Sequence, residues 1–77
     1  MIDFKELRVG EEAIITGYNQ GAESYRSKLL SMGLTRGTKI KLLKVAPMGD
    51  PIELEVRGFK LSLRKEEAKI LKLRREE

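Results

Sequence analysis

The sequence of 77 residues contains neither cysteine nor histidine. Without cysteine, the chain cannot form a disulfide bond or a thiolate-based zinc or iron–sulfur site. Without histidine, it lacks the usual catalytic base and the commonest ligand of transition metals. Its three methionines, Met1, Met32 and Met48, are scattered along the chain and are weak metal ligands. We therefore predict no metal site and no bound cofactor.

Long apolar runs are also absent. No run approaches the roughly 18 residues that a membrane-spanning helix requires. The first residues, MIDFKELRVG, lack the basic region and apolar core of a signal peptide. These absences favour a soluble cytoplasmic protein with no segment inserted into a membrane.

Side chains with catalytic potential are few. Asp50, Glu53 and Glu55 are the only acidic group near a predicted loop, and the two glutamates alternate with apolar residues as on the solvent side of a strand. No serine has a histidine partner, and no phosphate-binding GxxxxGKS/T motif is present. The sequence therefore favours a binding protein over an enzyme.

The charge is positive and uneven. The net charge is +4, of which residues 1–24 carry −3 and the remainder +7. A basic domain can bind nucleic acid, anionic lipid or an acidic protein surface. A nucleic-acid-binding small barrel is therefore an alternative function, although the chain has only four aromatic residues and no strand that interleaves them with basic ones for base stacking. The basic residues concerned are Lys39, Lys41, Lys44, Lys60, Arg64, Lys65, Lys69, Lys72, Arg74 and Arg75.

The polarity pattern predicts a single mainly β domain over residues 1–77. Five short strands are expected at 12–18, 38–45, 52–57, 59–64 and 70–73, with one helix at about 22–32 and a short helical turn near 65–68. A chain of this size buries only about 60% of its unfolded surface, so its core is thin. Curling the strands into a barrel compensates for the thin core and protects the edges. We expect a small five-stranded SH3-like barrel, with the helix inserted after the first strand as a lid on one opening.

Glycines and irregular alternation mark the places where the strands bend or turn. Gly17 within the first strand suggests a bulge or a sharp bend. The alternation of the second strand slips between Leu42 and Leu43, which also indicates a bulge. Gly58 separates two alternating runs closely enough to predict a tight hairpin.

The predicted helix has a clear stop signal. Its apolar stripe consists of Ala22, Tyr25, Leu29 and Met32, and we expect this stripe to plug the barrel. Gly33 follows where a helix commonly ends in a left-handed residue. Leu34 is placed to fold back on Leu29 as the hydrophobic contact of a Schellman motif.

The residues around the end of this helix are the best candidates for a partner-binding surface. Methionine and leucine side chains can form an adaptable apolar patch for a protein partner. The alternative for Leu30 and Leu34 is burial beneath the helix. The candidate residues are Leu30, Met32, Leu34, Arg36 and Met48.

Three blocks of the sequence closely resemble the FeoA family, the small cytoplasmic ferrous iron transport protein A. The blocks are SKLLSMGLTRGTKIKL, APMGDPIELEVRG and LSLRKEEAKIL, and the resemblance covers residues 7–73. It implies an SH3-like barrel and an accessory or regulatory role in bacterial ferrous iron uptake. The implied partner is a FeoB-type membrane permease with a cytoplasmic G-protein-like domain, which would recruit the chain to the inner face of the membrane.

The composition constrains how such a protein would act. Without histidine and cysteine the chain is a poor iron carrier, so we do not expect the transition-metal binding that the family can show. An arginine finger acting on the GTPase of the partner would come from Arg26, Arg36 or Arg57. The simpler expectation is that the protein binds the permease and modulates its transport or GTPase activity by binding alone.

Overall fold

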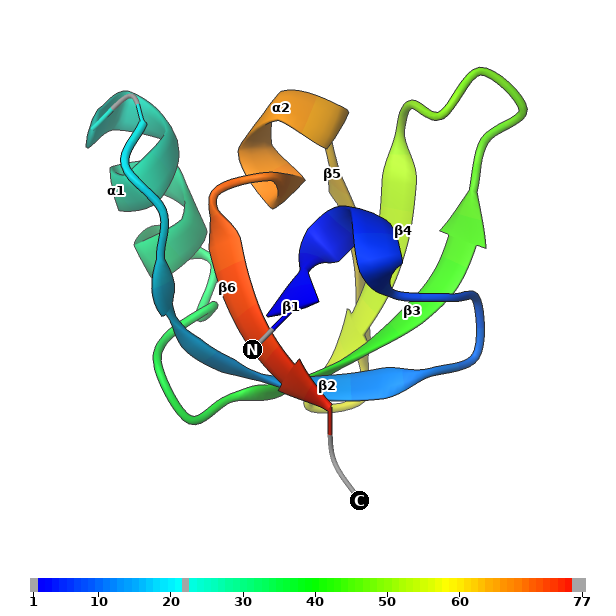
Figure 1. Cartoon of the computed structure of the whole chain (residues 1–77), viewed down its shortest axis with the longest axis horizontal. Coiled ribbons are helices and arrows are strands. Elements are labelled where there is room, and N and C mark those ends of the chain that lie inside the picture. Colours follow the sequence, from blue (N-terminus) through cyan, green and yellow to red (C-terminus); the bar gives the residue numbers. More distant parts are fainter. Residues whose placement is uncertain (1, 22, 76–77) are drawn as a thin grey trace.

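The computed structural model describes residues 2–21 and 23–75, which form a curled antiparallel sheet flanked by short helices (Figure 1). In chain order the elements are β1 (Ile2–Asp3), the 3-10 helix η1 (Phe4–Glu6), β2 (Glu12–Tyr18), α1 (Glu23–Ser31), β3 (Lys39–Val45), β4 (Ile52–Val56), β5 (Phe59–Leu63), α2 (Lys65–Ala68) and β6 (Leu71–Arg75).

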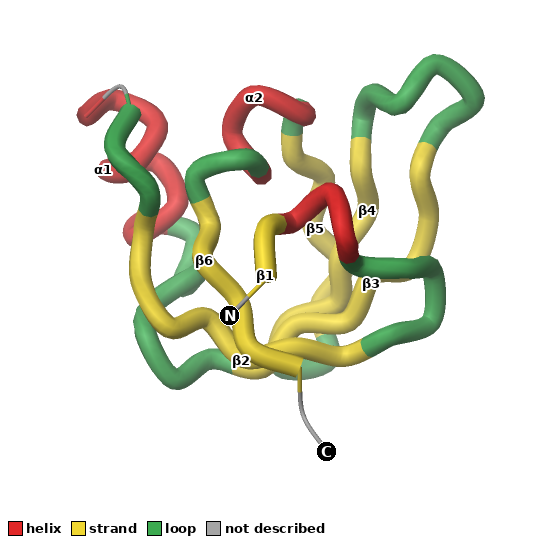
Figure 2. Tube along the Cα trace, in the orientation of Figure 1, coloured by secondary structure: helices red, strands yellow, loops and turns green. Residues whose placement is uncertain are grey.

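The six strands form one sheet in the order β1-β6-β2-β3-β4-β5. Figure 2 shows the strands wrapping around a common interior, so that the sheet is barrel-like. The barrel is not closed, because within residues 2–21 and 23–75 the edge strands β1 and β5 do not pair with each other. The mainly β, barrel-like fold predicted from the sequence is confirmed, with one strand more than expected. The additional strand is β1, whose two residues pair with Leu73 and Lys72 and are too few to give an alternation pattern.

Side-chain alternation explains which face of each strand is buried. In β4, Ile52, Leu54 and Val56 point into the barrel, while Glu53 and Glu55 lie on the outer face. The largest fully buried side chains come from β2, β3, β4, β5 and β6 and from the α1 region, and together they fill one core. They are Ile15, Leu29, Leu34, Ile40, Leu42, Leu54, Leu63, Leu71 and Leu73.

Both predicted irregularities are present. The register of β2 with β6 shifts between Ile15 and Gly17, and that of β3 with β4 shifts between Leu42 and Lys44. Bulges of this kind increase the local twist and bend a strand, which helps a short sheet to curl.

The hairpin between β4 and β5 is as tight as predicted. Val56 pairs with Phe59, so the connection consists only of Arg57 and Gly58. Both residues have positive φ, 52° and 85°, which is the geometry of a type I′ turn. Arg57 therefore belongs to the turn and not to the strand that the sequence predicts for it.

The α1 helix ends in the predicted Schellman motif. Gly33 has a φ of 87°, and its N–H donates to the carbonyl oxygen of Leu30 over 3.0 Å. The N–H of Leu34 donates to the carbonyl oxygen of Leu29 over 3.0 Å. Leu29 and Leu34 are both fully buried and supply the hydrophobic contact of the motif.

The expected role of α1 as a plug is only partly correct. Leu29 is buried and Met32 packs partly buried against the core, but Tyr25 remains 37% exposed. Ala22 lies outside the described residues. The prediction for Tyr25 is wrong because residues 23–28 are all exposed, so only the C-terminal end of α1 packs on the core. Figure 1 shows the helix standing beside α2 at one side of the barrel.

A buried carboxylate connects the two helices. Lys28 of α1 forms an ion pair with Glu67 of α2 at 2.6 Å, and Glu67 also accepts the backbone N–H of Arg64 at 2.9 Å. The hydrogen bond from Lys28, followed by that from Arg64, lowers the pKa of Glu67 below its ordinary value of 4.5. The short helix α2 was predicted at the position where it occurs.

Candidate functional site

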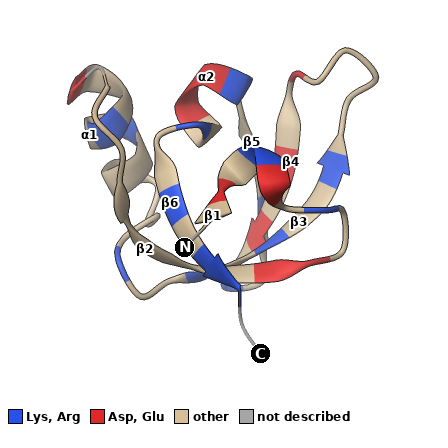
Figure 3. Cartoon of the chain, viewed as in Figure 1, with Lys and Arg blue, Asp and Glu red and all other residues tan. Residues whose placement is uncertain are grey.

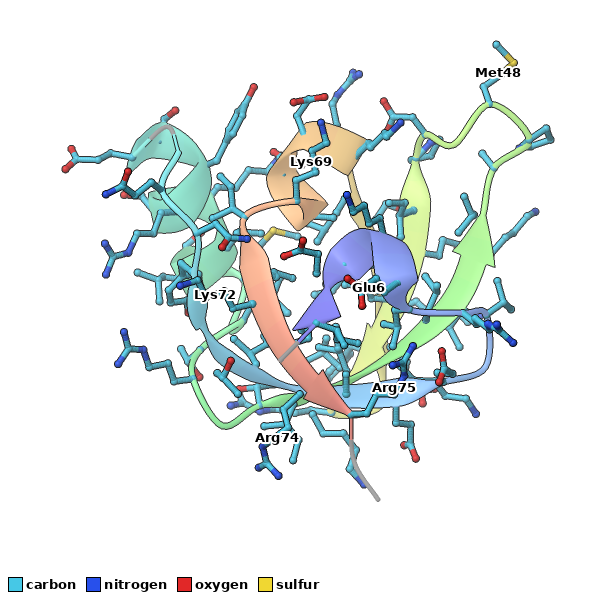
Figure 4. All side chains as sticks on the ribbon, viewed as in Figure 1. Glu6, Met48, Lys69, Lys72, Arg74 and Arg75 are labelled. Carbon is cyan, nitrogen blue, oxygen red and sulfur yellow. The ribbon has the colours of Figure 1, made fainter. Side chains whose placement is uncertain are left out.

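The five residues predicted to bind a partner do not form one surface. Leu30 is 41% exposed on α1, and Arg36 is exposed in the loop that follows this helix. Met48 is 89% exposed at the tip of the loop between β3 and β4, on the opposite side of the view from α1 (Figures 1 and 4). Met32 is only partly exposed. The structure therefore separates Met48 from the candidates near α1.

Leu34 is not available to a partner. Its side chain is fully buried, and its carbonyl oxygen accepts the hydroxyl of Tyr18 at 2.5 Å. The Schellman motif at Gly33 turns the chain inward, so the leucine that follows packs against Leu29 instead of reaching solvent. Of the two alternatives left open by the sequence, Leu34 takes the buried one and Leu30 the exposed one.

Two of the three candidate arginine fingers are engaged within the protein. The guanidinium of Arg26 lies 5.4 Å from the ring centroid of Tyr18, within the range of a cation–π contact. Arg57 donates from Nη2 to the hydroxyl of Thr38 at 3.4 Å. Arg36 lies beside Gly17: a Cβ atom added at position 17 would lie 3.9 Å from the guanidinium of Arg36.

Arg36 and Arg57 both line a polar pocket of about 480 Å³. The buried hydroxyl of Thr38 lies 3.0 Å from that of Thr35 and 3.5 Å from the carbonyl oxygen of Gly33. These contacts, with the bond from Arg57, connect the hairpin turn to the end of α1. The polar pocket is therefore lined in part by groups that already have partners. Its remaining lining residues are Glu12, Gly37, Lys39, Ile40, Lys41, Glu55 and Gly58.

A more apolar concave surface lies elsewhere, at the end of the barrel between η1, α2 and the loop that joins β3 to β4. It is a groove of about 660 Å³, which we call the apolar groove. Its floor consists of buried side chains from η1, β3, β4 and the segment after η1, and the half-exposed Val45 adds a side wall. The lining residues are Asp3, Phe4, Lys5, Leu7, Asn19, Leu42, Val45, Gly49, Ile52, Lys65 and Lys69.

Lysines dominate the charged rim of the apolar groove. Lys5 comes from η1, and Lys65 and Lys69 come from the start and the end of α2, against the single lining carboxylate Asp3. Figure 3 shows basic and acidic residues side by side on both of these short helices. In Figure 4, Lys69 projects near the end of α2, and Met48 projects from the tip of the loop that carries Gly49.

The sequence predicts no part of this groove except Met48, which adjoins the lining residue Gly49. The signals were present but weak: Phe4 and Leu7 are spaced three residues apart in the lead-in segment, and Val45 ends a strand whose alternation has slipped. Nothing local to these residues indicates that they converge, because they come from segments far apart in the sequence.

Two structural features are absent from residues 2–21 and 23–75. Among these residues, no cluster of three or more aspartate or glutamate side chains could hold a metal ion. Nor does any helix in this part of the chain have the length and apolarity to cross a membrane. The apolar groove has the shape and lining to accept apolar side chains.

Comparison with known proteins agrees with the resemblance seen in the sequence. The FeoA domain model matches residues 4–75. The solution structure of a FeoA-like protein from Clostridium acetobutylicum is 39% identical, has a TM-score of 0.86, and covers 96% of this chain and 85% of its own. FeoA from Stenotrophomonas maltophilia, described as a prokaryotic SH3 domain protein, has a TM-score of 0.80 with coverage of 96% and 91%. At 19% identity, the latter likeness supports the SH3-like fold alone.

A relative from Porphyromonas gingivalis carries a second part. It is an Fe(2+) transport protein A/Fe(2+) transporter FeoB fusion protein, 33% identical over 63 residues, which is 82% of this chain. The chain spans only 7% of the length of that fusion protein. Since the family model matches residues 4–75, from η1 to the end of β6, the chain belongs to the FeoA domain family, whose members are associated with ferrous iron transport.

Proposed function

We propose that this protein is an accessory subunit of bacterial ferrous iron uptake that binds the cytoplasmic part of a FeoB-type permease. The observation that carries the proposal is the relative in which a FeoA part and FeoB belong to one fusion protein. Two activities fused in one polypeptide are held at a high local concentration, so the fusion favours a physical association between the separate proteins as well.

The mechanism that fits the geometry is binding without chemistry by this chain. A bound protein shifts the conformational equilibrium of its partner by the difference between its affinities for the two states. An arginine finger would accelerate GTP hydrolysis by about 10³ to 10⁵. Of the three candidate fingers, Arg26 and Arg57 already contact Tyr18 and Thr38, and Arg36 lies in the exposed loop after α1. Binding without an arginine finger should change turnover much less.

The alternative function, nucleic-acid binding, gains no support from the positions of the aromatic residues. Phe4 is buried, and Tyr18 has the guanidinium of Arg26 over its ring. The two exposed rings lie on different elements, Tyr25 on α1 and Phe59 at the start of β5. A base-stacking platform needs neighbouring aromatic rings on one exposed surface.

The proposal is tested by retention of the detergent-solubilised permease, or of its cytoplasmic domain, on the immobilised protein. We expect stoichiometric retention, and a change in GTP turnover of less than about tenfold when the protein is added. If the folded protein retains neither the permease nor its domain, the proposal is wrong. An acceleration of 10³ or more would instead support the arginine-finger mechanism.

A further inference from the structure

We propose that this protein self-associates through the outer edge of β5, where the β5 strands of two copies pair antiparallel about a two-fold axis that passes between their Leu61 residues. The sheet of one copy would then continue into the sheet of the second copy. The inference is independent of the proposed function, because both sides of the contact are supplied by this chain.

The edge of β5 that faces away from β4, here called the open β5 edge, is accessible. β5 is the last strand in the sheet order and pairs only with β4. Phe59, Lys60 and Ser62 are all exposed, so no element within residues 2–21 and 23–75 covers this edge. The pairing with β4 has no bulge and β5 contains no proline, and a regular strand of this kind is a template for a further strand.

The tight hairpin determines which backbone groups are available at the open β5 edge. Val56 and Phe59 flank the two-residue turn and form a hydrogen-bonded pair, and the bonding direction alternates from there. The N–H and C=O groups of Phe59 and Leu61 therefore point toward β4, and those of Lys60 and Ser62 point away from it. Outside the strand pairs, no backbone–backbone hydrogen bond in the described part of the chain uses Lys60 or Ser62.

Charge selects one register for two copies of this strand. A two-fold axis at Lys60 would place two lysines directly opposite each other, and an axis at Ser62 would place Lys60 opposite Arg64. Like charges that face each other across strands are destabilising. An axis at Leu61 places Lys60 opposite Ser62 of the second copy, so both Lys60–Ser62 pairs can exchange their backbone hydrogen bonds without facing charges.

The same register brings carboxylates to both sides of each lysine. On β4, Glu55 is the cross-strand partner of Lys60, and Glu53 is the cross-strand partner of Ser62. Lys60 of one copy therefore lies between Glu55 of its own chain and, beyond the small side chain of Ser62, Glu53 of the second copy. The outer faces of the two sheets are complementary in charge, which is the observation that commits the open β5 edge to a second copy.

The inner face of β5 adds apolar contacts to the backbone pairing. Phe59, Leu61 and Leu63 alternate on this face, and their exposure falls along the strand from 71% at Phe59 to 1% at Leu63. In the antiparallel register, Phe59 lies opposite Leu63 of the second copy and diagonal to its Leu61. An aromatic ring reaches such diagonal neighbours, so dimerisation would cover an aromatic side chain that the single copy leaves in solvent.

The first test is measurement of the oligomeric state of the full chain and of contacts within the dimer. The contact is a short ladder, so we expect a weak dimer that sedimentation equilibrium detects between about 20 µM and about 2 mM. The amide resonances of Lys60 and Ser62 should shift with concentration over the same range. In a mixture of isotope-labelled and unlabelled chain, an intermolecular NOE should connect the Hα atoms of the two Leu61 residues, because facing residues of this kind have Cα atoms about 4.5 Å apart.

A proline variant tests the backbone pairing itself. Lys60→Pro removes an N–H that points away from β4, and an edge strand tolerates proline at such a position. We expect the Kd of the dimer to rise about tenfold or more, because two-fold symmetry removes the hydrogen bond twice. Lys60→Ala is the matched control: it keeps the N–H and loses only an exposed charge, so its Kd should stay within about threefold. Circular dichroism must show that both variants are folded.

The outcomes decide the proposal. A chain that remains monomeric up to about 2 mM overturns it, as does a dimer whose Kd is the same in Lys60→Pro and in the unmodified chain. If Lys60→Pro does not fold, the NOE between the Leu61 residues decides alone. If the chain stays monomeric while the cytoplasmic domain of the permease shifts the resonances of Lys60 and Ser62, the open β5 edge accepts a strand of the permease, and self-association is wrong.

Discussion

Leu34 offers the sharpest test of how this small core is built. The residue follows the glycine that ends α1, its side chain is fully buried, and its N–H completes the Schellman motif with Leu29. Leu34→Ala keeps the backbone hydrogen bond and removes only the packing of the side chain. The change therefore isolates the contribution of one leucine that joins the helix to the core.

The expected loss is large relative to the total. Truncation of a fully buried leucine to alanine costs about 3 kcal/mol, the sum of lost burial and a residual cavity. A domain of this length has a free energy of unfolding of about 4 to 12 kcal/mol. The substitution should thus remove a quarter or more of the stability, and it should lower the Tm by about 12 to 24 °C.

Leu30→Ala provides the matched control. Leu30 lies four residues earlier and is 41% exposed, so its truncation should cost less than about 1 kcal/mol. Urea unfolding followed by circular dichroism measures both variants against the unmodified chain. Equal losses in the two variants, or a loss below 1 kcal/mol for Leu34→Ala, would refute the assignment of Leu34 to the core. While it is folded, Leu34→Ala should bind the permease domain with unchanged Kd.

Three further predictions concern the helix ends and the hairpin. Because Lys28 and the backbone of Arg64 lower the folded-state pKa of Glu67 below 4.5, the stability that this carboxylate contributes is present above pH 4.5 and is lost as the pH falls through the lower folded-state pKa. Urea unfolding of Glu67→Gln between pH 7 and pH 2 should therefore show a shallower pH dependence than that of the unmodified chain. Gly33→Ala should cost about 1 kcal/mol, measured by the same unfolding assay, because alanine is strained at a φ of 87°. Thr38→Val should cost about 1 kcal/mol and speed amide hydrogen exchange at the hairpin turn, because the hydroxyl that accepts from Arg57 is lost.

Each of these predictions has an outcome that contradicts it. An unchanged pH dependence in Glu67→Gln would mean that the ion pair with Lys28 adds no stability. Full stability of Gly33→Ala would show that the end of α1 relaxes without the left-handed residue. Thr38→Ser retains a hydroxyl, so equal hydrogen exchange in the serine and valine variants would attribute the effect to packing and not to the hydrogen bond.

The strands and turns could be predicted because their signals are local. Alternation in residues 52–56 follows directly from the two-residue period of a strand with one buried face. The two bulges could be predicted from Gly17 and from the break in alternation after Leu42, because a bulge interrupts the two-residue period. Gly33 indicates the end of α1, because glycine adopts the left-handed conformation found there without the steric clash of a Cβ atom.

The exposure of α1 and the position of the groove could not be predicted in this way. The spacing of Tyr25 and Leu29 fits one helix face, but whether the face is covered depends on where the helix meets the barrel. Only its C-terminal end does so, which leaves Tyr25 partly exposed. The groove brings together Phe4, Val45 and Lys69 from three separate segments. No short-range sequence pattern indicates that these segments lie close together in the fold.

The pairing of the first and last strands has a consequence for how this fold is used. Ile2 lies opposite Leu73 in the antiparallel pair β1–β6, so the chain enters and leaves the domain at neighbouring points of one sheet edge. A unit with adjacent ends can be spliced into a loop of a larger host protein, or attached in tandem, without stretching either polypeptide. The adjacent ends are therefore compatible with the arrangement in the relative from Porphyromonas gingivalis, in which an Fe(2+) transport protein A part and the transporter FeoB share one polypeptide.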